Sequence, residues 1–92
     1  MKIQQEHLNR AIELAKTYGV TRLLLFGSAA TDLEQAKDLD LACDGIIGWK
    51  LYELGARLEE ELNVPLDLVP LRPPSRFTDI IERRGKVLYD TR

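Results

Sequence analysis

The apolar positions along the chain change between helical and strand spacing, and these changes predict the order of its elements. From Ile3 to Tyr18 they recur at three- and four-residue steps, which is typical of an amphipathic helix, and Gly19 ends that helix. The same spacing recurs from Ile46 to Leu62. A shorter helix is expected from Arg76 to Arg84, closed by Gly85.

Four short segments have the character of strands. Arg22 to Phe26 is a mostly apolar run followed by a glycine, which fits a buried strand. Asp38 to Asp44 and Pro65 to Leu71 alternate polar and apolar positions, and Lys86 to Asp90 forms a short final strand. This order predicts an α/β domain with a small mixed sheet and helices packed on one of its faces. We expect residues 1–92 to form a single domain.

Composition and charge narrow the class of protein. Hydrophobic residues make up 45% of the chain and charged residues 30%, as in globular proteins. No segment has the length of a membrane span and the N-terminus lacks the apolar core of a signal peptide, so we expect a cytoplasmic protein. Cys43 is the only cysteine, which excludes a disulfide framework and a zinc site built on several thiolates, and it is expected to be a small buried hydrophobe.

The net charge of −2 is unevenly distributed. Residues 32–67 contain ten acidic and three basic side chains, whereas residues 68–92 contain three acidic and six basic ones. An acidic middle segment argues against a broad nucleic-acid interface, which normally shows a basic face. An acidic segment is instead suited to a cation-binding site.

Three aspartates on two predicted strands form the candidate cation site. Asp38, Asp40 and Asp67 each have at least one apolar neighbour that must point into the core, so alternation puts all three carboxylates on the opposite face. Like charges about 4 Å apart repel by roughly 1 to 4 kcal/mol, and a bound cation would relieve this repulsion. Oxygen ligands of this kind select Mg²⁺ or Mn²⁺ over Zn²⁺ or copper.

The turn after the first strand is the candidate phosphate site. Gly27 lets a phosphate approach the main chain, Ser28 adds a hydroxyl donor, and residues 29–35 could form a short helix with free N–H groups at its start. Nine residues separate Ser28 from Asp38, which is enough to enter the second strand beside the first. We therefore expect the phosphate site and the metal site to be neighbours.

These motifs resemble the minimal nucleotidyltransferases of the DNA polymerase β-like superfamily. The resemblance runs from LLLFGS through DLDL and PLDLV to IIERRGKVLYD, and it implies a nucleotidyltransferase fold. It implies that Gly27 and Ser28 bind the triphosphate, that Asp38 and Asp40 bind the metals, and that Asp67 serves the second metal and the attacking hydroxyl. Two metals would assist attack of an acceptor hydroxyl on the α-phosphate.

Two functions remain open from the sequence. In the first, the chain is an enzyme that uses Mg²⁺ and a nucleoside triphosphate, expected to be ATP, to transfer AMP onto a hydroxyl. The resemblance implies a helical HEPN-domain toxin as partner and acceptor, with this chain as the antitoxin. In the second, the chain is a non-catalytic nucleotide-binding and antitoxin module that neutralises or scaffolds its partner by binding. Ala29, Asp32 and Lys37 stand where relatives often carry arginine, glycine and serine, and the first two of these favour the second function.

Several other side chains have alternative interpretations. His7 is expected at the surface. Trp49 and Tyr52 could stack on a base, but they are expected to pack on the sheet or on a partner. The basic residues near the C-terminus either form a solvated face or meet the triphosphate or a partner. These are Arg72, Arg76, Arg83 and Arg84. A chain this short also has a small core, so a homo- or hetero-oligomer is possible.

Overall fold

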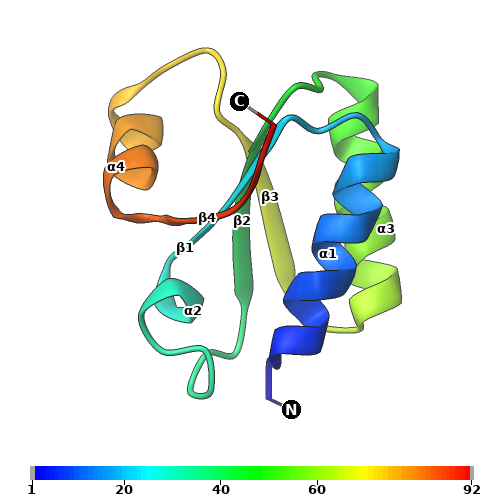
Figure 1. Ribbon diagram of the computed structural model, residues 1–92, viewed down its shortest axis with the longest axis vertical. Coiled ribbons are helices and arrows are strands. Elements are labelled where there is room, and N and C mark those ends of the chain that lie inside the picture. The colour runs from blue at the N-terminus through cyan, green and yellow to red at the C-terminus, as the bar shows by residue number, and fades with distance from the viewer. Residues whose placement is uncertain (1, 92) are drawn as a thin grey trace.

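The computed structural model describes residues 2–91, and its elements follow the predicted order (Figure 1). The chain forms α1 (Gln5–Thr17), β1 (Arg22–Phe26), α2 (Ser28–Thr31), β2 (Leu39–Asp44), α3 (Trp49–Leu62), β3 (Leu66–Pro70), α4 (Arg76–Arg84) and β4 (Lys86–Asp90). None of the helices in residues 2–91 is long and apolar enough to span a membrane.

The four strands form one mixed sheet in the order β3-β2-β1-β4. β1 pairs antiparallel with both β2 and β4, whereas β2 pairs parallel with β3. A parallel pair needs a crossover connection, and α3 provides it between β2 and β3. The expected small mixed sheet is therefore confirmed.

Helices α1 and α3 cover one face of the sheet, as Figure 1 shows. The main core lies between these two helices and the sheet. Because side chains alternate along a strand, five residues of β1 and β2 point into this core: Leu23, Leu25, Leu39, Leu41 and Cys43. All five side chains are buried, as expected for Cys43. This face is thus filled by buried apolar side chains.

The position of α4 corrects the expectation that all helices pack on one face. α4 lies across the sheet from α1 and α3 (Figure 1), where its Ile81 packs with Leu24, Ala42 and Leu71 in a second, smaller core. Leu24 and Ala42 face this side because they alternate with the main-core residues. Leaving both exposed would cost hydrophobic free energy, and α4 covers them.

An ion pair fixes α4 to the sheet. The guanidinium of Arg22, a buried residue at the start of β1, contacts the Glu82 carboxylate of α4 at 2.6 Å. A buried cation is tolerated only with such a partner, so this contact helps to hold α4 over the second face.

Candidate active site

Asp40 and Asp67 lie side by side on the face of the sheet opposite α1 and α3. The two residues are directly paired in the parallel register of β2 and β3, and adjacent strands are about 4.8 Å apart. Their neighbours Leu39 and Leu66 point to the other face, toward the main core. Two carboxylates from segments separated by α3 thus come together at the beginning of the two parallel strands.

Asp38 lies one residue before β2 rather than within it, which differs from the predicted start of that strand. Its side chain is exposed, like that of Asp67, whereas Asp40 is partly buried. Burial raises the pKa of the Asp40 carboxyl, and the negative charges of Asp67 and then Asp38 raise it further. Asp40 is therefore the electrostatic centre of the three carboxylates.

A fourth acidic residue on this face, Asp44, is already engaged. Its carboxylate lies 3.5 Å from the Arg72 guanidinium and accepts a hydrogen bond of 3.0 Å from the Gly45 N–H. Asp44 is at the far end of β2 from Asp40. No hydrogen bond or ion pair within residues 2–91 involves the carboxylates of Asp38, Asp40 or Asp67. The charge near Asp40 is thus uncompensated by the protein.

Gly27 brings the turn after β1 directly against Asp40. Phe26, the last residue of β1, is the register partner of Asp40, and Gly27 follows with a φ of 73°. A Cβ atom built on Gly27 would overlap with Oδ2 of Asp40. The backbone therefore approaches the carboxylate more closely than any other residue type would allow.

The helix after this turn is shorter than expected. α2 covers one turn, Ser28–Thr31, and Asp32 leaves it in an extended conformation while its N–H donates to the Ser28 carbonyl at 2.9 Å. Such a helix has little macrodipole, so phosphate binding here depends on individual N–H groups and the Ser28 hydroxyl. Gly27 and Ser28 are both exposed and accessible to a ligand.

The chemistry of the donor set fits a divalent cation with oxygen ligands. Three carboxylates with mutual repulsion and no cationic partner are the groups that Mg²⁺ or Mn²⁺ binds. As placed, however, no group of three or more His, Cys, Asp or Glu side chains within residues 2–91 surrounds a common point. The exposed side chains of Asp38 and Asp67 have room to change rotamer, so a cation would have to draw them toward Asp40.

The aromatic residues at the start of α3 lie apart from the three aspartates. Trp49 and Tyr52 are exposed and stacked on each other, with ring centroids 5.6 Å apart, so they do not pack on the sheet. α3 starts after the end of β2, whereas Asp40 is near the beginning of that strand. His7 has a local role, because its Nδ1 accepts a hydrogen bond from the Gln4 N–H at the start of α1.

Two contacts between β1 and α4 were not predicted from the sequence. The Phe77 ring of α4 meets Phe26 edge to face, with centroids 5.8 Å apart. The Arg22–Glu82 ion pair joins the same two elements. The sequence contains one signal for the first contact, since Phe77 is the only aromatic residue of the helix predicted from Arg76 to Arg84.

The fold resembles solved structures from toxin–antitoxin complexes. A tri-AMPylated Shewanella oneidensis HEPN toxin in complex with an MNT antitoxin gives a TM-score of 0.76 and 27% identity, covering 97% of this chain and 74% of the matched chain. A toxin–antitoxin structure with AMP-PNP gives 0.78 and 26%, covering 92% and 74%. A protein provisionally described as a minimal nucleotidyltransferase gives 0.72 and 26%, covering 88% of both chains. No protein-family model and no curated protein matches the sequence.

The structural likeness extends over nearly the whole chain, and it includes the strands and the turn that carry Asp40, Asp67 and Gly27. It agrees with the resemblance of the sequence motifs. The structural neighbours and the sequence motifs together support the minimal nucleotidyltransferase family for this chain.

Proposed function

We propose that this chain is an antitoxin that transfers AMP from ATP onto a hydroxyl of a HEPN-type partner protein. The observation that carries the proposal is the position of Asp40, which lies between Asp67 on β3 and Gly27 on the turn after β1. A phosphate chain beside Gly27 would therefore also lie beside a pair of carboxylates. A protein that consumes ATP would work in the cytoplasm.

The protein groups have separate roles in this reaction. Gly27 gives the phosphates access to the backbone, and the Ser28 hydroxyl and nearby N–H groups donate hydrogen bonds to them. Asp38, Asp40 and Asp67 would hold divalent metal, proposed to be Mg²⁺ or Mn²⁺, which neutralises phosphate charge and lowers the pKa of a coordinated hydroxyl.

The exposed Asp67 carboxylate is proposed to orient the acceptor hydroxyl and to accept its proton. The hydroxyl oxygen then forms a bond to the α-phosphorus, the bond from that phosphorus to the bridging oxygen breaks, and pyrophosphate leaves. The acceptor side chain ends with a covalently attached AMP.

The nature of the partner is supported by the two toxin–antitoxin neighbours. One contains an AMPylated HEPN toxin with an MNT antitoxin, and another contains the ATP analogue AMP-PNP. Both carry a chain of the fold described above. We propose the same class of partner and nucleotide for this chain, with a tyrosine as the acceptor side chain.

Intact-mass measurement tests the proposal. The chain would be incubated with ATP, Mg²⁺ and the HEPN-type protein encoded in its source genome, and the partner should gain the mass of one or more AMP groups. The Asp38→Asn, Asp40→Asn double variant should leave the partner unmodified. A stable complex in which the wild type adds no AMP would contradict catalysis.

The second function, a non-catalytic nucleotide-binding module, is favoured by two observations. The three aspartates do not surround a common point as placed, and α2 ends after one turn at Asp32. Such a module would neutralise its partner by binding alone. It predicts the outcome just described, in which a complex forms and nucleotide binds without transfer.

A further inference from the structure

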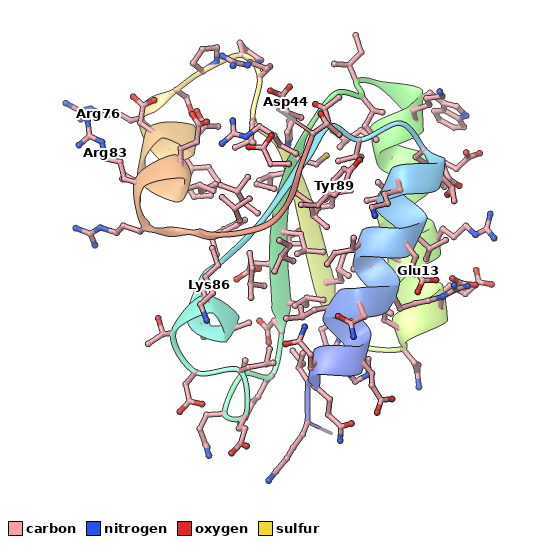
Figure 2. All side chains as sticks on the ribbon, in the orientation of Figure 1. Glu13, Asp44, Arg76, Arg83, Lys86 and Tyr89 are labelled. Carbon is pink, nitrogen blue, oxygen red and sulfur yellow. The ribbon has the colours of Figure 1, made fainter. Side chains whose placement is uncertain are left out.

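Helix α4 and the start of β4 expose an unusual combination of apolar and basic side chains. Phe77 and Ile80 are 53% exposed and Val87 is 57% exposed, which is high for residues of this size. Arg76, Arg83 and Arg84 are exposed on the same helix, and Figure 2 shows Arg76 and Arg83 extending outward from α4, away from the sheet. We call these six residues the α4 surface.

The arginines of the α4 surface have no counter-ion in the protein. No ion pair within residues 2–91 involves Arg76, Arg83 or Arg84. Of the two acidic residues of α4, Glu82 is paired with Arg22 at 2.6 Å, and Asp79 is exposed and forms no ion pair with these arginines. The basic charge of this surface is therefore available to an external partner.

Local helix energetics explain only part of this charge. Arg83 and Arg84 lie in the last turn of α4, where cations interact favourably with the helix dipole. Arg76 is the first residue of α4, directly after the N-cap Ser75, and a cation at that end is unfavourable. The helix dipole therefore does not account for Arg76.

The α4 surface is continuous with the candidate active site. Phe77 contacts Phe26 edge to face at 5.8 Å, and Phe26 is the register partner of Asp40. Val87 is paired with Leu24 on β1 and so faces the same side of the sheet. A molecule bound on the α4 surface would therefore lie beside the turn at Gly27.

We propose that the α4 surface binds an acidic, partly apolar face of the protein that carries the acceptor hydroxyl. This inference rests on the proposed function. The arginines would pair with carboxylates of the partner, and Ile80 and Val87 would be buried against its apolar side chains. Docking there would bring the acceptor hydroxyl to the rim of the carboxylate cluster.

A protein partner fits this surface better than a nucleic acid. Three exposed aliphatic or aromatic side chains would gain hydrophobic free energy against protein, whereas a phosphate backbone offers them nothing. Phe77 is the only aromatic residue of the α4 surface, and single-stranded nucleic acids are normally bound by several stacked aromatic side chains.

Isothermal titration with the HEPN-type protein from the source genome tests the surface. The Arg76→Glu, Arg83→Glu variant should bind that protein roughly tenfold or more weakly than the wild type, and its binding should depend less on salt. Ile80→Asp should weaken binding by a similar factor, because it puts a carboxylate into the apolar part of the surface. Thermal melting would verify that both variants are folded.

The matched control is Lys50→Glu, Arg57→Glu on α3, which makes the same change in net charge on the other side of the sheet. It should leave the affinity for the HEPN-type protein within about twofold of the wild-type value, since charges far from an interface contribute little to binding. Equal binding by wild type and by the α4 variants, or a larger loss in the α3 control, would overturn the inference. Absence of binding by the wild type would overturn the proposed function, and this inference with it.

Two further measurements test whether the α4 surface binds something other than the HEPN-type protein. One is titration with a mixed-sequence single-stranded RNA, and the other is the size of the isolated chain in solution. Salt-sensitive RNA binding that the α4 variants lose, with unchanged affinity for the HEPN-type protein, would make the surface a nucleic-acid site and contradict the proposal. Self-association of the wild type that the same variants abolish would make it a contact between copies of this chain. The proposal expects neither result.

Discussion

Gly27 and Asp40 lie so close together that any side chain at position 27 would occupy the space of the Asp40 carboxylate. This contact depends on the antiparallel register of β1 and β2, in which Phe26 pairs with Asp40 and the chain then turns at Gly27. The two residues that the sequence assigns to phosphate and metal are thus parts of one structural unit. Changing one should disturb the other.

Gly27→Ala should eliminate ATP binding and lower stability by about 1 to 3 kcal/mol, because it combines an unfavourable backbone conformation with an overlap on Asp40. Gly48→Ala is a matched control, since Gly48 has a similar backbone conformation, with φ 61°, but open space around it. The control should lose stability and keep ATP binding. Urea unfolding measures the stability of each variant, and isothermal titration measures its affinity for ATP. Equal ATP affinity of the two variants would show that the contact between Gly27 and Asp40 is not needed for nucleotide binding.

Asp40→Asn should raise the melting temperature of the metal-free protein. The folded-state pKa of Asp40 is raised by burial and by Asp67 and Asp38, so ionised Asp40 opposes folding at pH 7. The stabilisation of wild type by protonated Asp40 is full below the ordinary pKa of 3.8 and is lost as pH rises through the raised value. The advantage of the variant should therefore be largest near pH 7 and disappear in acid.

Melting curves in EDTA at neutral and acidic pH measure this difference. Removing a like-charge repulsion of about 1 kcal/mol corresponds to roughly 4 to 8 °C in a domain of this size. Magnesium should stabilise wild type and leave Asp40→Asn nearly unchanged, through linkage to the bound ion. A variant that melts below wild type in EDTA would show that the carboxylates do not repel one another in the folded state.

Alternation made one part of the site predictable from the sequence. Since a strand has a period of two, the leucines beside Asp40 and Asp67 fix the face that both carboxylates occupy. The side of the sheet that α4 covers was not predictable in this way, because a helical stripe shows that a face is buried without showing against what. The closeness of Gly27 to Asp40 also requires the strand register, which depends on long-range pairing.

Glu82→Gln should destabilise the fold by about 1 to 3 kcal/mol. In the wild type the Glu82 carboxylate is the closest charged partner of the buried Arg22 guanidinium, at 2.6 Å, and the substitution removes its charge. Glu13→Gln is the control, since Glu13 pairs with Arg10 at 3.2 Å on the exposed side of α1. That variant should lose less than about 0.5 kcal/mol. Urea unfolding would measure both, and similar losses would mean that the Arg22 pair does not anchor α4.

Asp67→Asn should reduce AMP transfer far more than it reduces ATP binding. Its proposed role is to orient and deprotonate the acceptor hydroxyl, which is an interaction of the transition state, and removal of such a general base costs about 10² to 10⁴-fold in rate. Asp44→Asn is the matched control, because Asp44 is on the same face but is paired with Arg72 at 3.5 Å.

Single-turnover transfer, followed by the mass of the HEPN-type partner, gives the rate for each variant, and titration with ATP gives the affinity. Asp44→Asn should transfer AMP at nearly the wild-type rate, since its carboxylate already has a counter-ion and lies at the far end of β2. Complex formation should survive both substitutions, because neither aspartate belongs to the α4 surface. If Asp67→Asn lost rate and ATP affinity by the same factor, its carboxylate would be acting through nucleotide binding, and the proton acceptor would have to be sought elsewhere among the three aspartates.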